Sequence, residues 1–365
     1  MINKALIWYN QSNNAKKGKP KLKGKGGERP QKPFAGREMI YKAQRPEDGE
    51  HAAQRAPAVK KKKKRSGAAF AVVMIALALT VAAVLAIVAL ARGGDEPNSL
   101  SALPVTGDGD YVDTYSGPVY SDDSFLYNDE SFTAYEGVRR NEYDPAGFTY
   151  EGGRLSYTDP ATGERALTGI DVSSHQDAID WRAVAADGID FAMIRVGYRG
   201  NTEGKLNLDN RFIENIEGAS AAGIPIGIYF FAQAIDVYEA RAEANWVLEQ
   251  LEGYEITYPV VYDWEYVGGD VRTANTDGRT IDECCEEFCS IIGGAGYKTM
   301  IYFNRELAIR TIDLYRLQKY DFWLAEYNEA PTFFYGFEML QYTYTGRVNG
   351  IEGGVDLNLC FKNYK

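Results

Sequence analysis

The second half of the chain alternates short apolar runs with stretches of helical periodicity. Eight runs have the length and the β-branched and aromatic content of strands. In chain order they are TGIDVS, DFAMIRVGY, IPIGIYFFA, YPVVYDWEYV, KTMIYFN, DFWLAEYN, FEMLQYTYT and GVDLNLCF. Segments such as DVYEARAEANWVLEQLEG, with Asp236 as N-cap and Gly253 as a stop, predict helices between them. Continuous apolar strands alternating with helices are typical of parallel sheets covered on both faces.

Eight strands within residues 166–365 predict an α/β domain, an irregular β/α barrel of the TIM-like kind. The segment is short for eight complete βα units, so we expect some helices to be abbreviated or missing. In a parallel barrel the carboxyl ends of the strands share one rim, where active sites lie. Polar residues that would gather there are Asp171, Tyr198, Arg199, Tyr229, Asp263, Glu265, Asn304, Glu326, Gln341 and Asp356.

The run YPVVYDWEYV, residues 258–267, places two acids inside an apolar strand. Alternation sends Asp263 and Glu265 to the same face, with Cα atoms about 6.6 Å apart at about 3.3 Å per residue. A solvated strand face is the ordinary explanation of such a triplet, but the surrounding Val, Tyr and Trp residues argue against exposure. An unpaired buried carboxylate is costly, so buried acid pairs are often functional.

Residues 67–91 form an uncharged, almost wholly apolar run. As a helix this run would be about 37 Å long, against roughly 30 Å of bilayer hydrocarbon, so it predicts one transmembrane helix. The basic cluster Lys60–Arg65 before it predicts a cytoplasmic N-terminus and an extracellular C-terminal part at the cell membrane. The alternative is a signal peptide cleaved after Ala91, although such peptides usually have an apolar core of only about 7 to 15 residues.

The net charge of the chain changes sign where this apolar run begins. Residues 1–66 carry 19 Lys and Arg against 5 Asp and Glu, a net charge of +14, and the remaining residues carry a net charge of −25. The tail is poor in apolar residues, which predicts a disordered cytoplasmic segment. It is a candidate for contact with anionic lipid or nucleic acid, although the charge equally serves as a topology signal with no specific partner.

Residues 92–165 are acidic and rich in Gly, Ser, Asp and Tyr. Their low aliphatic content predicts an extracellular stalk rather than a core. Near its end, aromatic and polar residues alternate around Gly152 and Gly153, which makes a small hairpin a candidate there.

The four cysteines predict neither a disulfide framework nor a metal site. Cys284, Cys285 and Cys289 fall on one predicted amphipathic helix, where they are poorly placed to bridge one another, and we interpret them as core residues. A Cys289–Cys360 disulfide is the alternative. The spacing does not match a zinc site, histidines are scarce, and no cofactor is predicted.

Several common catalytic motifs are missing from the sequence, which narrows the reactions that the chain could catalyse. The two histidines are His51 in the tail and His175, so histidine triads and histidine metal clusters lack parts. No glycine pattern of a phosphate-binding loop follows a predicted strand. Carboxylates and aromatics remain in quantity, and glycoside hydrolysis uses this pair, with one protonated carboxyl as acid, others as charge stabilisers and aromatic faces for sugars.

The motifs GIDVSSHQDAIDW, FAMIRVGYRG, GIPIGIYFFA, VVYDWEYV, FWLAEYN and LQYTYTGRVNGIEGGVDLNLC resemble, in this order, the family 25 glycoside hydrolases, the muramidases also described as lysozymes. The resemblance covers about residues 167–364. It implies an irregular β/α barrel that cleaves the β-1,4 bond between N-acetylmuramic acid and N-acetylglucosamine in peptidoglycan.

The resemblance also implies roles for four acids. Glu265 would be the general acid/base, and Asp263 would orient and polarise the substrate's N-acetyl group, which acts as an internal nucleophile with net retention. Asp171 and Asp356 would shape the electrostatics of the site. Physical reasoning supports one member of such a cluster staying protonated, but it does not select Glu265.

Aromatic and polar residues near the strand ends are candidates for sugar contact: Tyr198, Tyr229, Trp323, Tyr327, Gln341 and Tyr342. The chain departs from the family at Phe230, Leu340 and Asp177, where His, Trp and Gly are common. These changes alter the predicted cleft lining and leave the acids intact. We interpret His175 as a hydrogen-bonding loop residue rather than a catalyst.

These features predict a membrane-anchored muramidase that acts locally in cell-wall remodelling. One alternative is a catalytically silent barrel that binds wall glycans as a tether or sensor. Another is a glycosidase that acts on a different N-acetylated polysaccharide.

Overall fold

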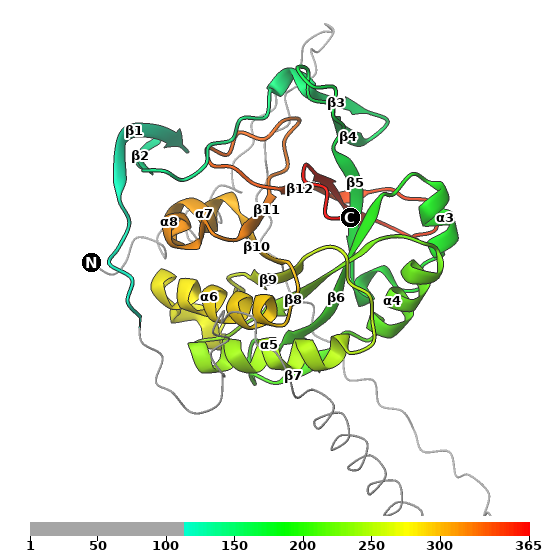
Figure 1. Ribbon diagram of the computed structural model, residues 1–365. Helices are drawn as coiled ribbons and strands as arrows, with labels where there is room; N and C mark the ends of the chain where they lie inside the picture. Colours follow the sequence, from blue (N-terminus) through cyan, green and yellow to red (C-terminus); the bar gives the residue numbers. More distant parts are fainter. Residues whose placement is uncertain (1–112) are drawn as a thin grey trace, which may run out of the picture.

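The protein is described by a computed structural model over residues 113–365, and its centre is a closed barrel of eight strands (Figure 1). The strands are β5 (Leu167–Val172), β6 (Phe191–Arg199), β8 (Ile226–Ala232), β9 (Val260–Trp264), β10 (Thr299–Asn304), β11 (Asp321–Ala325), β12 (Met339–Gly346) and β13 (Val355–Cys360). Their order is β5-β13-β12-β11-β10-β9-β8-β6, and β6 pairs back with β5. All eight coincide with predicted runs, so the barrel prediction is confirmed.

The last strand runs against the others. Seven barrel strands are parallel, whereas β13 is antiparallel to both β12 and β5. The expectation of an all-parallel barrel is therefore wrong for β13. Residues 347–354 alone connect β12 to β13, and a parallel crossover needs about a dozen residues or more, so the chain turns back on itself.

Helices cover only part of the barrel. They are α3 (Trp181–Ala186), α4 (Phe212–Ala221), α5 (Val237–Leu251), α6 (Gly278–Gly294), α7 (Arg305–Arg310) and α8 (Leu314–Leu317). Asp236 caps α5 through a 2.9 Å bond to the Glu239 amide, as predicted. The shortness of α3, α7 and α8, and the helix-free loop 326–338 between β11 and β12, confirm that some helices are abbreviated or missing.

Short elements complete the connections. They are β7 (Leu206–Leu208), antiparallel to β6, and the 3-10 helices η1 (Pro145–Gly147), η2 (Ser174–Gln176) and η3 (Arg272–Asn275).

Large side chains fill the barrel interior below the rim. Phe191, Met193, Met300 and Met339 belong to this inner cluster, which is separate from the larger apolar layer between the strands and the helices. Gly169 on β5 makes room for them, because a Cβ there would lie 2.2 Å from the Phe191 ring. The interior is therefore a packed core, closed at its lower end.

Two hairpins precede the barrel. The first consists of β1 (Tyr120–Tyr127) and β2 (Glu130–Tyr135), and the second of β3 (Phe148–Glu151) and β4 (Arg154–Tyr157). The second turns at Gly152 and Gly153, with φ of 60° and 83°, which are the positive values that a tight two-residue hairpin turn requires. A hairpin at this position is the one that the sequence predicts.

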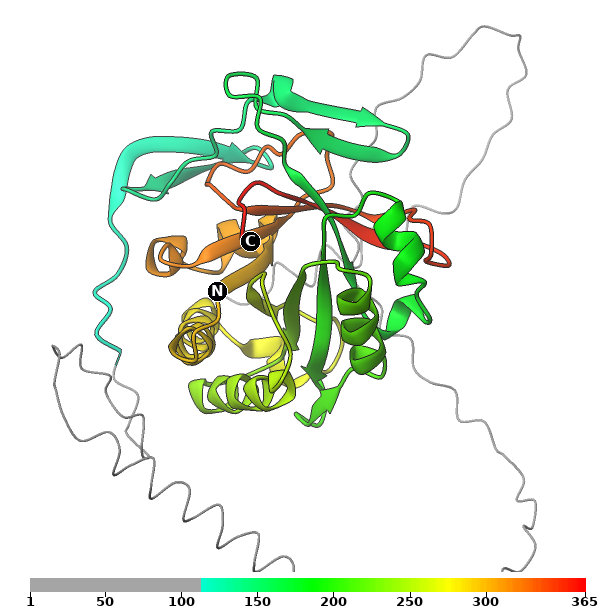
Figure 2. The same ribbon diagram turned by 45° about the vertical axis from the view of Figure 1, so that its right-hand side comes forward.

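The hairpins pack on the barrel where it lacks helices. In Figures 1 and 2 both lie on the side of the barrel away from α5. Phe125 stacks on Phe334 of the helix-free loop at 4.4 Å between ring centroids, and Tyr157 contacts Phe361 just after β13. Leu155 is buried in the same apolar layer as the outer faces of β12 and β13. Residues 120–157 thus take the place of the missing crossover helices.

The expected stalk is therefore not what the structure has over residues 113–165. Aliphatic residues are few there, but aromatic rings supply the apolar surface that buries the hairpins. The composition of the segment is low in Leu, Ile and Val and rich in Tyr, so a judgement based on aliphatic content misses its core.

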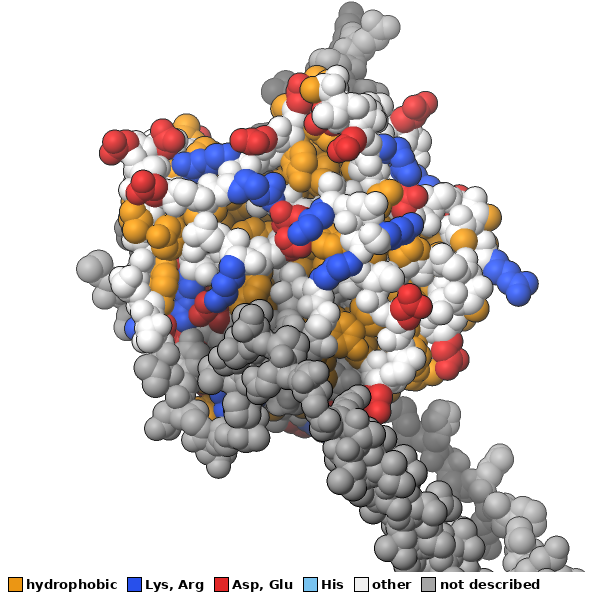
Figure 3. Space-filling model, viewed as in Figure 1, with side chains coloured by type: hydrophobic (Ala, Val, Ile, Leu, Met, Phe, Trp, Pro, Cys, Tyr) orange, Lys and Arg blue, Asp and Glu red, His pale blue; other side chains and the backbone are white. Residues whose placement is uncertain are grey.

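The remaining predictions on organisation have different outcomes. Within residues 113–365 no helix combines the length and apolar character needed to cross a membrane. The predicted tail 1–66 and transmembrane helix 67–91 lie outside the described residues. Cys284, Cys285, Cys289 and Cys360 are all free and buried, so a Cys289–Cys360 disulfide is not formed. On the face in Figure 3, charges of both signs are interspersed.

Candidate active site

Four carboxyl groups meet at one rim of the barrel. Asp171 on β5 and Asp356 on β13 are direct partners in the antiparallel ladder. Asp263 lies near the end of β9, and Glu265 is the first residue after that strand. After burial, the charge of Asp171 contributes to the raised pKa of each of the other three carboxyls, so the four form one electrostatic cluster.

Asp356 reaches this rim by an unexpected route. It is the second residue of β13, at the start of the strand rather than its end. Because β13 is antiparallel to its neighbours, its start lies at the rim where the parallel strands end. Asp356 therefore lies at the predicted rim. It does so because β13 is antiparallel to its neighbours and not because it ends a parallel strand.

Asp171 is held in place by two amides. Its Oδ2 accepts hydrogen bonds from Nδ2 of Asn358 at 2.8 Å and from Nε2 of Gln341 at 3.0 Å. Burial raises the pKa of Asp171 to about 6, while the two amide bonds favour the charged form and limit the rise. Asp171 is thus the member of the cluster best equipped to carry negative charge.

Asp263 has the opposite environment. Its side chain is buried, and no group within residues 113–365 donates a hydrogen bond to its Oδ1. Burial first, and then the charges of Glu265 and Asp171, raise its pKa well above the ordinary value, with Arg195 acting in the opposite direction. An unpaired buried carboxyl oxygen is costly, so this atom is positioned to receive a donor from a bound molecule.

Glu265 and Asp356 hold their protons more strongly than ordinary carboxyls do. Burial, followed by the charge of Asp171, raises the pKa of Glu265 to about 7 and that of Asp356 to about 9. A carboxyl with a pKa near 7 can both donate and accept a proton under physiological conditions. Glu265 therefore has the property that an acid/base catalyst requires.

Aromatic rings form the floor and part of the rim. Trp323 lies edge-on to Tyr302 and Tyr229, at ring-centroid distances of 5.1 and 6.2 Å. It is only 2% exposed, so its ring supports the floor and offers little free surface for the predicted sugar contact. Tyr229 is half-buried above it, whereas Tyr198 and Tyr327 are exposed at the rim.

Two other candidates for sugar contact are occupied elsewhere. Gln341 is buried, and its Oε1 accepts hydrogen bonds from the hydroxyls of Tyr302 at 3.1 Å and Tyr327 at 2.9 Å, while its Nε2 holds Asp171. Gln341 therefore organises the site from within. Tyr342 points away from the interior and is buried with Leu155 in the outer layer. It follows Gln341 directly on β12, and alternation sends the two to opposite faces.

The site also contains three residues that were not predicted from the sequence: Arg195, Tyr302 and Asn358. Arg195 pairs with Asp209 at 2.7 Å and lies beside Tyr229 in the sheet register. Its position inside the barrel could have been predicted from the sequence, because Arg195 shares its face of β6 with the apolar residues Phe191 and Met193. Arg199, which was predicted to lie at the rim, instead pairs with Glu243 on α5.

The loop after β5 lies beside the cluster. His175 in η2 lies at the surface, and partial removal of water from its ring, followed by the charge of Arg195, lowers its pKa. Asp177 has a φ of 50°, in the region where an L side chain is strained, which accounts for the Gly that the family commonly has there.

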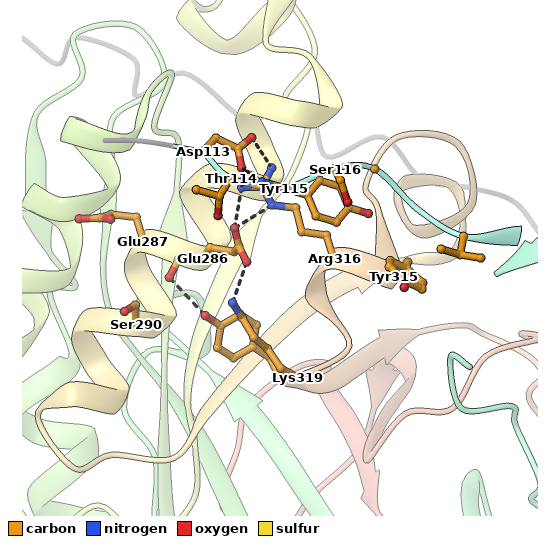
Figure 4. Close-up of a pocket in the computed structure, with 13 residues that line it drawn as sticks. Asp113, Thr114, Tyr115, Ser116, Glu286, Glu287, Ser290, Tyr315, Arg316 and Lys319 are labelled. Atoms are coloured by element: carbon orange, nitrogen blue, oxygen red, sulfur yellow. Dashed lines mark hydrogen bonds and ion pairs between the residues drawn. The ribbon is translucent and has the colours of Figure 1, made fainter. Parts of the chain in front are cut away.

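No metal site accompanies the cluster. Within the described part of the chain, no three His, Cys, Asp or Glu side chains are arranged to hold a metal ion. An open groove of about 630 Å³ lies elsewhere, between α6, α8 and residues 113–119, and Figure 4 shows its charged lining. The groove contains none of the four clustered carboxyls.

A closed barrel that carries a cluster of protonatable carboxyls above an aromatic floor has the parts used by enzymes that cleave glycosidic bonds. The chain belongs to the glycosyl hydrolases family 25, whose sequence profile matches residues 170–351.

Individual relatives agree with this assignment. Lysozyme M1 of Streptomyces globisporus is 30% identical over 209 residues, which cover 53% of this chain and 67% of that protein. The autolytic lysozyme of Clostridium acetobutylicum is 26% identical over 200 residues, 53% of this chain and 55% of that protein.

Solved structures of similar proteins include the modular autolysin LytC from Streptococcus pneumoniae in complex with a synthetic peptidoglycan ligand. It is 26% identical, with a TM-score of 0.47, covering 58% of this chain and 52% of that chain. The chain thus spans little more than half the length of the Clostridium and Streptococcus proteins.

Proposed function

We propose that this protein is an N-acetylmuramidase that hydrolyses the β-1,4 bond between N-acetylmuramic acid and N-acetylglucosamine in peptidoglycan. The observation that carries the proposal is the convergence of Asp171, Asp263, Glu265 and Asp356 on one rim. Membership of family 25 and the two lysozymes among its relatives support the choice of substrate.

The environments of the acids support a division of roles. Glu265, with a pKa of about 7, serves as general acid and then general base. Asp263 has a free buried oxygen that can accept the N–H of the substrate's N-acetyl group and orient that group for attack on the anomeric carbon. Asp171, fixed by two amides, supplies negative charge beside the developing oxocarbenium ion.

Sugar binding falls to the accessible aromatics. Tyr198 and Tyr327 are exposed at the rim, and Tyr229 is half-buried between them and the floor. Their rings offer apolar faces to the C–H surfaces of a sugar. Trp323 and Tyr342, being buried, take no direct part.

We further propose that the enzyme is a single-pass protein of the cell membrane, with a cytoplasmic N-terminus and the barrel outside, and that it remodels the wall locally. The apolar run 67–91 and the basic cluster before it support this topology. The basic tail would then face anionic lipid or nucleic acid on the cytoplasmic side.

The reaction can be tested with residues 93–365 and purified peptidoglycan. We expect new reducing ends that mass spectrometry identifies as N-acetylmuramic acid. Reducing ends of N-acetylglucosamine would move the cleaved bond, and a protein that binds the glycan without releasing product would instead be a wall-binding module.

The role of Glu265 is tested by Glu265→Gln. We expect at least a 10³-fold loss of product release with an unchanged circular dichroism spectrum, because the acid/base and its proton are removed together. Glu249→Gln, at an exposed position on α5, is the matched control and should keep wild-type activity. An active Glu265→Gln variant would refute the assigned role.

A further inference from the structure

The backbone of Glu265 needs support that β9 does not provide. The strand ends at Trp264, so Glu265 begins the loop that leads to η3. Its main-chain oxygen accepts a 2.7 Å hydrogen bond from Nε2 of Gln233, a fully buried residue just beyond the end of β8. The peptide that carries the proposed acid is therefore tied to the neighbouring strand end by a side chain.

The Gln233 amide has a single satisfactory orientation. Its Nε2 also donates to the main-chain oxygen of Ala232 at 2.8 Å, and two carbonyl oxygens can be approached only by the nitrogen. On its other side, Oε1 accepts a hydrogen bond from the hydroxyl of Thr273 at 2.8 Å. Thr273 lies on η3 and is fully buried, so the amide is clamped between the strand ends and the loop.

A second group fixes the main chain of Gln233 itself. Its N–H donates to Oε1 of Glu243 on α5 at 3.3 Å. The carboxylate of Glu243 pairs with Arg199 at 2.7 Å and accepts the hydroxyl of Tyr262 on β9 at 2.9 Å. All of these groups are buried, where hydrogen bonds hold geometry most strongly.

We propose that Gln233 is a positioning residue for the reaction, acting through Glu265, and that Thr273 and Glu243 keep the Gln233 amide in register. The Gln233 side chain is fully buried, and its amide bonds to the Glu265 peptide oxygen, the Ala232 carbonyl and the Thr273 hydroxyl. The inference rests on the proposed function of Glu265. Its physical basis is that a displacement of about 1 Å of a reacting group can cost about 10²-fold in rate.

The kinetic test compares Gln233→Leu, Thr273→Val and Thr273→Ser on soluble peptidoglycan fragments. We expect Gln233→Leu to lower kcat about 10- to 100-fold while KM changes less than about threefold, because the acid is misplaced and the sugar contacts remain. Thr273→Val, which removes the hydroxyl at constant shape, should lower kcat by a smaller factor, and Thr273→Ser should restore it.

Gln318→Leu is the matched control, since Gln318 is exposed at the end of α8 and its amide bonds only to the Tyr315 carbonyl. Its kinetics should equal those of the wild type. Wild-type kcat in both Gln233→Leu and Thr273→Val, with both variants folded, would overturn the proposal. If Gln233→Leu fails to fold, the Val and Ser pair at Thr273 decides the matter.

A readout independent of turnover separates this inference from the proposed function. The titration of the Glu265 carboxyl can be followed by ¹³C NMR of glutamate-labelled protein, with Glu265→Gln supplying the assignment. We expect Gln233→Leu and Thr273→Val to move its midpoint toward that of an ordinary glutamate, because the carboxyl leaves its buried place beside Asp171. A wild-type protein that releases no product refutes the muramidase, whereas an unmoved midpoint in both variants refutes the positioning role.

Discussion

At the scale of single residues, the four clustered carboxyls have raised pKa values, which favour their protonated forms. Burial is the first cause of the raised pKa of Asp171, Asp263, Glu265 and Asp356, and mutual repulsion adds to it for the last three. Of these four described carboxyls, Asp171 is the one whose charged form accepts hydrogen bonds from two side-chain amides. The cluster thus combines one acid that ionises readily with neighbours that stay protonated, which is the asymmetry that acid catalysis beside a charge stabiliser requires.

This cluster makes stability depend on pH. The pKa of Asp356 is about 9 in the folded protein and near 4 in the unfolded chain, so the folded state binds more protons between these values. The stability that Asp356 contributes is then fully present below about pH 4 and is lost as pH rises toward 9. We expect Asp356→Asn to be more stable than the wild type at pH 8, on the order of 1–3 kcal/mol, and equal to it at pH 4.

Thermal unfolding of the wild type and Asp356→Asn from pH 4 to pH 9 measures this difference. Asp122→Asn, at an exposed position on β1, is the control and should follow the wild type at every pH. An Asp356→Asn protein that is less stable than the wild type at pH 8 would show that the carboxylate is stabilised by a contact that outweighs its burial.

At the scale of elements, the hairpins belong to the catalytic domain. Strands β12 and β13 follow connections without helices, so their outer faces need another cover. The family profile begins at residue 170 and does not include the hairpins, yet Tyr143, Leu155 and Tyr157 are packed into the common apolar layer. We therefore include both hairpins in the folded unit, which extends well before residue 166.

Leu155 provides a direct test of that boundary. It is 1% exposed on β4, so Leu155→Ala should lower the free energy of unfolding by about 2–4 kcal/mol through lost burial and a residual cavity. Leu126 on β1 is 73% exposed, and Leu126→Ala should change it by less than about 0.5 kcal/mol. Urea unfolding of residues 113–365 measures both, and a stability unchanged by Leu155→Ala would return the hairpin to a stalk.

At the scale of the whole molecule, the described domain begins with a tightly held segment. The carboxylate of Asp113 pairs with the buried Arg316 at 3.2 Å (Figure 4). It also pairs with Arg279 at 2.9 Å, and the Tyr115 hydroxyl donates to Asp313 at 2.5 Å. The chain therefore enters the domain at a defined place along α6 and α8.

The proposed anchor has a simple test in cells. We expect the full chain to sediment with membranes and to stay there in high salt and alkaline carbonate, because an apolar span is held by burial and not by charge. Residues 93–365 alone should remain in the supernatant. Added protease should degrade the barrel in intact wall-stripped cells and spare the tail, and release of the full chain by salt would contradict the anchor.

Local pattern was sufficient for a large part of this protein. Each of the eight strands could be predicted because apolar runs and their boundaries are properties of neighbouring residues. Asp263 could be assigned to the inner face because alternation along a strand is a local rule, whereas Glu265 lies just past the end of β9, where that rule no longer applies. The charge division and the apolar run 67–91 are likewise properties of the sequence alone.

The tertiary structure decided whatever depends on which strand lies beside which. The direction of β13 brings Asp356 to Asp171, and the packing of the outer layer turns Tyr342 away from the cleft. The absence of crossover helices recruits the aromatic hairpins, and the closure of the barrel places Gln233 against Glu265. These contacts join residues far apart in the chain, and their energies depend on burial and geometry that exist only after the barrel has closed.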